Sequence, residues 1–147
     1  MLYFDDFAVG QTFASGTVTV ETEAIKAFAA EFDPQPFHLD EEAASASLFG
    51  GLVASGWHTA ALSMRLLVDG DLRVVGGLIG MGVEELRWPR PVHPGDVLRV
   101  ESEILELRPS KSQPGRGIAK VRNTTRNQDG QPVMIQVVNM IVPRRPA

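Results

Sequence analysis

The chain of 147 residues contains no cysteine, which excludes disulfides, thiolate nucleophiles and thiolate metal sites together. It also has no apolar run near the ~20 residues that span a membrane, and its first residues contain no basic segment leading into an apolar one. We therefore expect a soluble, cytoplasmic protein without membrane association. A net charge of −4 with mixed signs argues against nucleic acid as a partner, because phosphate binding needs a concentrated basic face.

Length and the absence of repeats or low-complexity linkers favour one domain over residues 1–147. Apolar residues at helical spacing predict a helix over 22–32, with Thr22 as its N-cap. This helix must end before Pro34, since a proline pushes the preceding residue out of the α region. Asp40 is expected to cap a short second helix, because acidic residues follow it in the first turn.

A third helix is predicted from Gly56 to Val68, after the glycine-rich connection "LFGGLVASG". The apolar stripe that we expect it to bury consists of Trp57, Ala60, Ala61, Met64, Leu67 and Val68. Leucines at 62 and 66 extend this character around most of the circumference, which indicates a helix in the middle of the fold.

The second half of the chain is predicted to form strands. Apolar and polar residues alternate from 97 to 107, with Leu98, Val100 and Ile104 on one face. Two further segments are joined through Asp129-Gly130, a strong hairpin signal because glycine accepts positive φ. The predicted strands lie within residues 11–20, 74–88, 97–107, 117–128 and 132–143. The expected fold class is α+β, with a long antiparallel sheet wrapped around a central buried helix.

The segment "DPQPFH" places Asp33 five residues before His38, with two prolines between them. Each proline fixes its own φ and restricts the residue before it, so we expect an extended or turning loop that holds the two side chains at a fixed separation. Taken singly, a loop aspartate or an isolated histidine is usually structural. Together they form a pair whose protonation states can be tuned apart for acid and base work near neutral pH.

Metal binding is the competing interpretation, since His38 and Asp40 form an H-x-D pattern. A catalytic zinc site usually takes three protein ligands, and the chain has only two other histidines, His58 and His93. Structural or solvated roles fit both of them. We therefore expect no metal site.

The segment "ASGWH" begins the third helix, with Ser55 as a natural N-cap. Gly56 allows another group to approach the backbone, where unpaired N–H groups face outward at the positive end of the helix dipole. Such a terminus suits a developing negative oxygen. Alternatively, Ser55 only caps the helix and Gly56 only relieves crowding.

A basic loop, "RPSKSQPGRG", carries Lys111 and Arg116 among proline, serine and glycine. These cations suit contact with a phosphate, although the spacing is no defined motif and charged loop tips are more often solvated.

The segments "FDPQPFHLDEEAA" and "GGLVASGWHTAALSMRL" resemble the MaoC-like dehydratase family, which includes the (R)-specific enoyl-CoA hydratases and adopts the hot-dog fold. The hydratase motif, approximately D-x-N-P-x-H-x-D, matches at Asp33, Pro36, His38 and Asp40. Gln35 stands where asparagine is usual. The segments "LRWPRPVHPGD" and "NQDGQPV" also look like this family, so the resemblance covers nearly the whole chain.

The resemblance implies that Asp33 and His38 activate a water molecule and manage its proton, while the Gly56 N–H holds the oxygen of a coenzyme A (CoA) thioester. It implies reversible hydration of a trans-2-enoyl-CoA to the (R)-3-hydroxyacyl-CoA, with no cofactor. Ser55 stands where many hydratases have a histidine, and Met64 where some have a serine.

We expect Ser55, Trp57, Lys111 and Arg116 to contact the acyl-CoA substrate, the last two at its phosphates. Leu48, Phe49, Trp57 and Met64 are candidates for an apolar pocket. We also expect a homodimer, as hot-dog domains generally form. Two alternatives remain: a hot-dog acyl-CoA thioesterase, which the lack of an acid between Gly56 and Val68 disfavours, and a non-catalytic acyl-CoA or partner-binding module.

Overall fold

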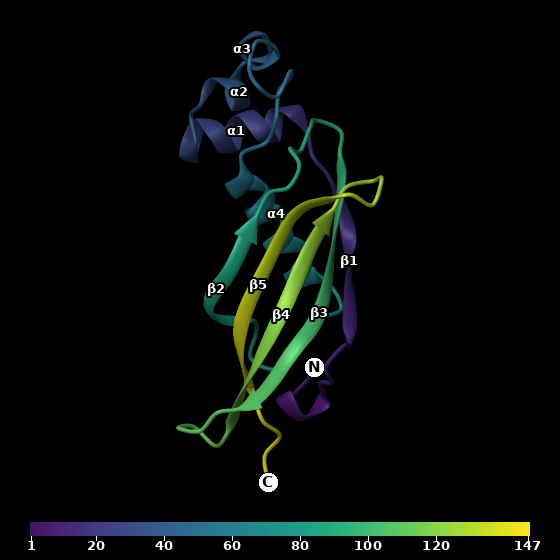
Figure 1. Ribbon diagram of the computed structural model, residues 1–147, viewed down its shortest axis with the longest axis vertical. Coiled ribbons are helices and arrows are strands. Elements are labelled where there is room, and N and C mark those ends of the chain that lie inside the picture. The colour runs from purple at the N-terminus through teal and green to yellow at the C-terminus, as the bar shows by residue number, and fades with distance from the viewer.

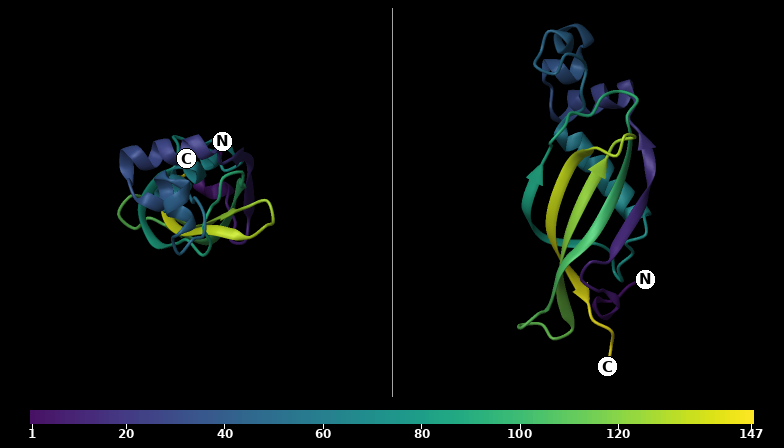
Figure 2. Two further views of the ribbon diagram at one scale, coloured as in Figure 1. Left: turned by 90° about the horizontal axis from the view of Figure 1, so that it is seen from above. Right: turned by 45° about the vertical axis from the view of Figure 1, so that its right-hand side comes forward.

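Five antiparallel strands curve around one long helix in the computed structural model, which describes residues 1–147 (Figure 1, Figure 2). The strands are β1 (Thr12–Thr19), β2 (Ile79–Arg87), β3 (Val97–Pro109), β4 (Arg116–Arg126) and β5 (Pro132–Pro143). Their order across the sheet is β1-β3-β4-β5-β2, so β1 and β2 form its two edges. Each strand coincides with or overlaps a predicted segment, and the predicted α+β class is confirmed.

The alternation predicted for β3 is confirmed, because Leu98, Val100 and Ile104 are buried on the face toward the helix. The hairpin between β4 and β5 turns where the sequence indicated. Gly130 there has φ +76°, a left-handed conformation that glycine adopts without steric cost.

Three helices gather beyond one end of the sheet: α1 (Thr22–Phe32), α2 (Pro36–Leu39) and α3 (Glu41–Ser45) (Figure 1). The N-cap of α1 is Glu21, so the prediction of Thr22 was wrong by one residue. The expected extended or turning loop is present at 33–35, but at 36–39 the chain forms one helical turn. Its first residue is a proline, whose fixed φ suits the start of a helix.

Asp40 caps α3, as predicted, because its Oδ2 accepts a hydrogen bond of 3.0 Å from the N–H of Ala43. This exposed carboxylate anchors the chain between the short helices. A single-turn 3₁₀ helix, η1 (Phe4–Asp6), lies at the opposite end of the molecule, near the C-terminus (Figure 1).

The long helix α4 spans Gly56–Asp69, but the stripe predicted to be buried is largely exposed. Trp57, Met64 and Val68 are 58%, 45% and 55% exposed. The buried residues are instead His58, Thr59, Ser63, Leu66 and Leu67. A small polar side chain can face the sheet when its polar group finds hydrogen-bond partners within the helix and on the strands.

The Ser63 hydroxyl illustrates this internal bonding. It donates to the Thr59 carbonyl at 2.7 Å and lies 2.6 Å from the hydroxyl of Thr125 on β4. With its one proton already used, Ser63 must accept from Thr125, so both buried hydroxyls are satisfied.

Two apolar clusters fill the space between the sheet and the helices. One, which includes Ile25, Leu67 and Leu98, packs α1, α4 and the adjoining strand ends together. The other, which includes Phe4, Ile104 and Val142, lies under η1 at the far end. None of the helices combines the length and the apolar character needed to cross a bilayer.

Candidate active site

The connection Val53–Gly56 leads into α4 between two other pieces of chain and is hydrogen-bonded to both. On one side the Val53 N–H donates to the Phe37 carbonyl at 3.2 Å. On the other side the Ala54 N–H donates to the Val92 carbonyl at 2.9 Å. The loop of the Asp-His pair and the proline-rich loop after β2 are thereby fixed against the start of α4.

His38 lies on the single turn of α2 and is 5% exposed. Its Nδ1 is 2.7 Å from the Val53 carbonyl. Because a carbonyl can only accept, Nδ1 carries the proton of this bond, and neutral His38 has its lone pair at Nε2. The ring also packs edge-on against Phe37, with centroids 4.6 Å apart. Tautomer and orientation are therefore both fixed.

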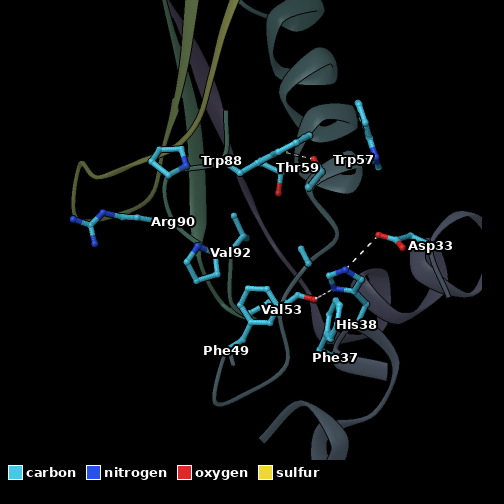
Figure 3. Close-up of a pocket in the computed structure, with 14 residues that line it drawn as sticks. Asp33, Phe37, His38, Phe49, Val53, Trp57, Thr59, Trp88, Arg90 and Val92 are labelled. Carbon is cyan, nitrogen blue, oxygen red and sulfur yellow. Dashed lines mark hydrogen bonds and ion pairs between the residues drawn. The ribbon is translucent and has the colours of Figure 1, made fainter. Parts of the chain in front are cut away.

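Asp33 directly follows α1, and its Oδ2 is 3.3 Å from Nε2 of His38 (Figure 3). The Gln35 amide donates to its Oδ1 at 2.5 Å. Hydrogen bonding by the Ser55 hydroxyl, then by Gln35, and the nearby charge of His38 lower the pKa of Asp33, although burial opposes them. Gln35, which departs from the motif asparagine, thus joins Ser55 in favouring the ionised form of the carboxylate.

Two proton acceptors therefore face each other when His38 is neutral: the Asp33 carboxylate and the His38 Nε2 lone pair. A water molecule has two protons and can donate one to each acceptor. The oxygen of such a water is oriented with its lone pairs outward and is activated as a nucleophile.

The N-terminus of α4 faces the same pocket. Ser55 is fully buried and caps the helix by accepting a bond of 3.2 Å from the Trp57 N–H. The predicted cap is confirmed. The Gly56 N–H has no acceptor within the chain, so it is a free donor at the positive end of a 14-residue helix.

The pocket between these groups has a volume of about 340 Å³ (Figure 3). It brings together the predicted Asp33, His38, Gly56, Trp57 and Phe49. Leu48 is almost fully exposed and, like Met64, does not line it. The remaining lining residues are Phe37, Val53, Ala54, Thr59, Trp88, Pro89, Arg90, Pro91 and Val92.

Lys111 and Arg116 do not share this pocket. They belong to the β3–β4 hairpin, which lies at the opposite end of the sheet from α2 (Figure 1). Within one chain, the expectation that they hold the phosphates of a ligand in this pocket is wrong.

The other two histidines lie outside the pocket. His58 is buried, its ring stacks on Phe28 with centroids 4.9 Å apart, and burial lowers its pKa. Its Nδ1 has no hydrogen-bond partner. His93 is exposed in the proline-rich loop.

The sequence did not single out the residues of the loop 88–92. Trp88 lies on Gly56, and its indole N–H donates to the Gly56 carbonyl at 3.0 Å (Figure 3). The one signal that could have indicated this loop was its composition, because two prolines flank Arg90 directly after an expected strand. Nothing in the sequence indicated that this loop meets a helix terminus 32 residues earlier.

Comparison with known proteins gives a consistent result. Residues 6–127 match the sequence profile of the MaoC like domain. A crystal structure of the MaoC-like dehydratase from Rhodospirillum rubrum covers 100% of both chains, with 55% identity and a TM-score of 0.97. The protein YdeM of Bacillus subtilis is 33% identical over 95% of this chain and 98% of its own.

The 3-hydroxyacyl-thioester dehydratase Z of Mycobacterium tuberculosis is 37% identical over 101 residues, which are 66% of this chain and 64% of its own. A second M. tuberculosis protein, described as having a double hotdog fold, superposes with a TM-score of 0.80 at 24% identity. It covers 99% of this chain and 45% of its own. The expected hot-dog fold is confirmed.

Proposed function

Because the chain belongs to the MaoC-like dehydratase family, we propose that it adds water reversibly to a trans-2-enoyl-CoA to form the (R)-3-hydroxyacyl-CoA. One observation carries the proposal. An Asp-His pair 3.3 Å apart opens into the same pocket as an unpaired helix-terminal N–H. The mycobacterial relative named a 3-hydroxyacyl-thioester dehydratase supports the same reaction type.

In the first step, the oxygen of the water held by Asp33 and His38 bonds to C3 of the substrate. His38 Nε2 takes one water proton and becomes an imidazolium. The electron pair of the C2=C3 bond moves toward the thioester carbonyl, whose oxygen becomes negative. The Gly56 N–H donates to this oxygen at the positive end of α4.

In the second step, the imidazolium returns the proton to C2, which restores the thioester carbonyl and neutral His38. Water has then been added as OH at C3 and H at C2, and every charge is balanced. The lowered pKa of Asp33 keeps it a carboxylate throughout. Its role is to orient the water and to stabilise the transient positive charge on His38.

No cofactor enters this scheme, because two side chains and one backbone N–H account for each proton transferred and each charge formed. The aromatic side chains of Phe37, Phe49, Trp57 and Trp88 supply apolar wall for the acyl thioester. Acyl-CoA is accordingly the proposed partner.

We also propose that the chain works as a homodimer paired along β2. This strand is a sheet edge with unpaired backbone groups, and Ile79, Met81 and Val83 on it are about half exposed. Pairing two edges would satisfy the backbone and cover these side chains. Contact of Lys111 and Arg116 with the CoA phosphates is proposed only between two copies of the chain. A stable monomer in size-exclusion chromatography at micromolar concentration would contradict the dimer.

The test is an assay with crotonyl-CoA that follows both the enoyl absorbance and the release of free thiol. Hydration removes the absorbance without releasing thiol. A thioesterase would release thiol, and a non-catalytic binding module would do neither across a panel of acyl lengths. Either of these outcomes would refute the proposal.

Replacing His38 tests the pair itself. His38→Ala removes the base, and His38→Asn does so while leaving an amide N–H near the position of Nδ1 that can still donate to Val53. Both variants should lose turnover, and His38→Asn should keep the unfolding temperature closer to that of the wild type. A folded His38→Asn variant that turns over at the wild-type rate would show that the imidazole is not the base.

A further inference from the structure

Trp88 touches the start of α4 in two ways. Its indole N–H donates to the Gly56 carbonyl at 3.0 Å, and its ring lies directly on the Gly56 Cα. A methyl group added at Gly56 would be 2.6 Å from Cε2 and 2.9 Å from Nε1 of this ring. Glycine is therefore required at this position for the ring to lie where it does.

The peptide group between Gly56 and Trp57 is held at both of its ends. Its N–H donates to the Ser55 side chain at 3.2 Å, and its carbonyl accepts from the Trp88 indole at 3.0 Å. Just upstream, the Ala54 N–H is bonded to the carbonyl of Val92. Glycine is the most permissive residue in φ and ψ. The N–H of Gly56 therefore keeps one direction only because the peptide groups before and after it are held by hydrogen bonds.

We propose that Trp88 is a positioning residue for the reaction: it clamps the first turn of α4 so that the free Gly56 N–H points at the thioester oxygen. This inference rests on the proposed hydratase function. An oxyanion donor contributes only when it is preorganised, because a donor that must reorient during the reaction loses much of its effect. Trp88 supplies this preorganisation from a loop distant in sequence.

Trp57 provides the contrast. It lines the same pocket and meets the Trp88 ring edge-on, with centroids 5.2 Å apart and planes at 80°. Its side chain makes no hydrogen bond to the backbone of α4 and is mostly exposed. The two tryptophans thus share the wall, but only Trp88 holds a helix carbonyl.

The kinetic test compares Trp88→Phe with Trp57→Phe. Trp88→Phe keeps an aromatic ring over Gly56 and removes the N–H bond, so kcat should fall about 10- to 100-fold with little change in KM. Trp57→Phe changes the wall of the same pocket and keeps the hydrogen bond between Trp88 and Gly56, so it should alter KM more than kcat. A Trp88→Phe variant with wild-type kcat, or with a change confined to KM, would overturn the proposal.

A double-mutant cycle tests the clamp without relying on activity. Gly56→Ala should lower the urea midpoint strongly in the wild type and much less in Trp88→Leu, because the smaller side chain leaves room for the added methyl group. Additive effects in the cycle would overturn the clamp. If the two substitutions are strongly coupled but the wild type does not hydrate enoyl-CoA, the proposed reaction is refuted and the contact between Trp88 and Gly56 still stands.

Discussion

Asp33→Asn is the substitution whose effect follows most directly from the geometry. It replaces a carboxylate by a neutral side chain of nearly the same shape. The remaining oxygen can still accept a bond from the Ser55 or Gln35 side chain, so the fold should persist. The new amide N–H would donate to the Nε2 lone pair of His38 and block the base.

The expected loss can be worked from the distance between the two groups. At 3.3 Å, opposite charges attract by ~5 kcal/mol in an effective dielectric of about 20. The attraction exists only while His38 carries the extra proton, which makes it a contribution to the transition state. Its removal should lower kcat by roughly 10³- to 10⁴-fold.

The assay is initial-rate hydration of an enoyl-CoA that the wild type turns over, with circular dichroism and thermal unfolding as controls for the fold. Asp40→Asn is the matched control variant. It neutralises a nearby carboxylate that only caps α3, and asparagine caps helices about as well as aspartate. Asp33→Asn activity within about threefold of this control would refute the electrostatic role, since that ratio corresponds to under ~1 kcal/mol.

The pH dependence of stability gives a second readout of Asp33. Its pKa is lowered in the folded protein, chiefly through the Ser55 hydroxyl. The stability that the carboxylate contributes is therefore present above the unfolded pKa of about 3.9 and is lost as pH falls through the folded pKa. The difference in unfolding free energy between wild type and Asp33→Asn should accordingly shrink below about pH 4. A pH-independent difference would contradict the assigned shift.

Two further predictions concern stability. Gly117 lies under the Phe4 ring, so Gly117→Ala should lower the free energy of unfolding in urea by about 1–3 kcal/mol. Gly16 has open space around it, so Gly16→Ala is the control. Equal urea midpoints for the two variants would contradict the packing of Phe4 on Gly117. Burial lowers the pKa of His58, so the unfolded chain binds its proton first and the unfolding free energy should decline as pH falls below about 6.5. His58→Phe keeps the stack on Phe28 and should lack this part of the decline; an unchanged decline would assign it to other groups.

The sequence was sufficient for features that depend on local chemistry. Pro34 set the limit at which α1 ends, and the caps at Asp40 and Ser55 follow from residue type alone. Strand alternation identified the buried face of β3 because its pattern has a period of two. These predictions needed no knowledge of which elements meet.

Features that depend on tertiary contacts could not be predicted in this way. Apolarity suggested the wrong face of α4, since the Ser63 hydroxyl is buried through bonds to the Thr59 carbonyl and to Thr125 on β4, while Met64 stays exposed in the single chain. Likewise, the separation of Lys111 from the pocket follows from the length and direction of β3. The contact between Trp88 and Gly56 joins the loop after β2 to the start of α4, and no sequence pattern connects the two.

Hydration in deuterium oxide, with the product analysed by proton NMR, shows from which face each atom of water reaches the substrate. A single base at Nε2 of His38 takes the water proton and returns it from the same side of the substrate. We therefore expect a 3-hydroxyacyl-CoA with deuterium at C2 and hydroxyl at C3 on the same face, and no such product from His38→Asn. Addition to opposite faces, release of free CoA, or unreacted enoyl-CoA with the wild type would contradict it.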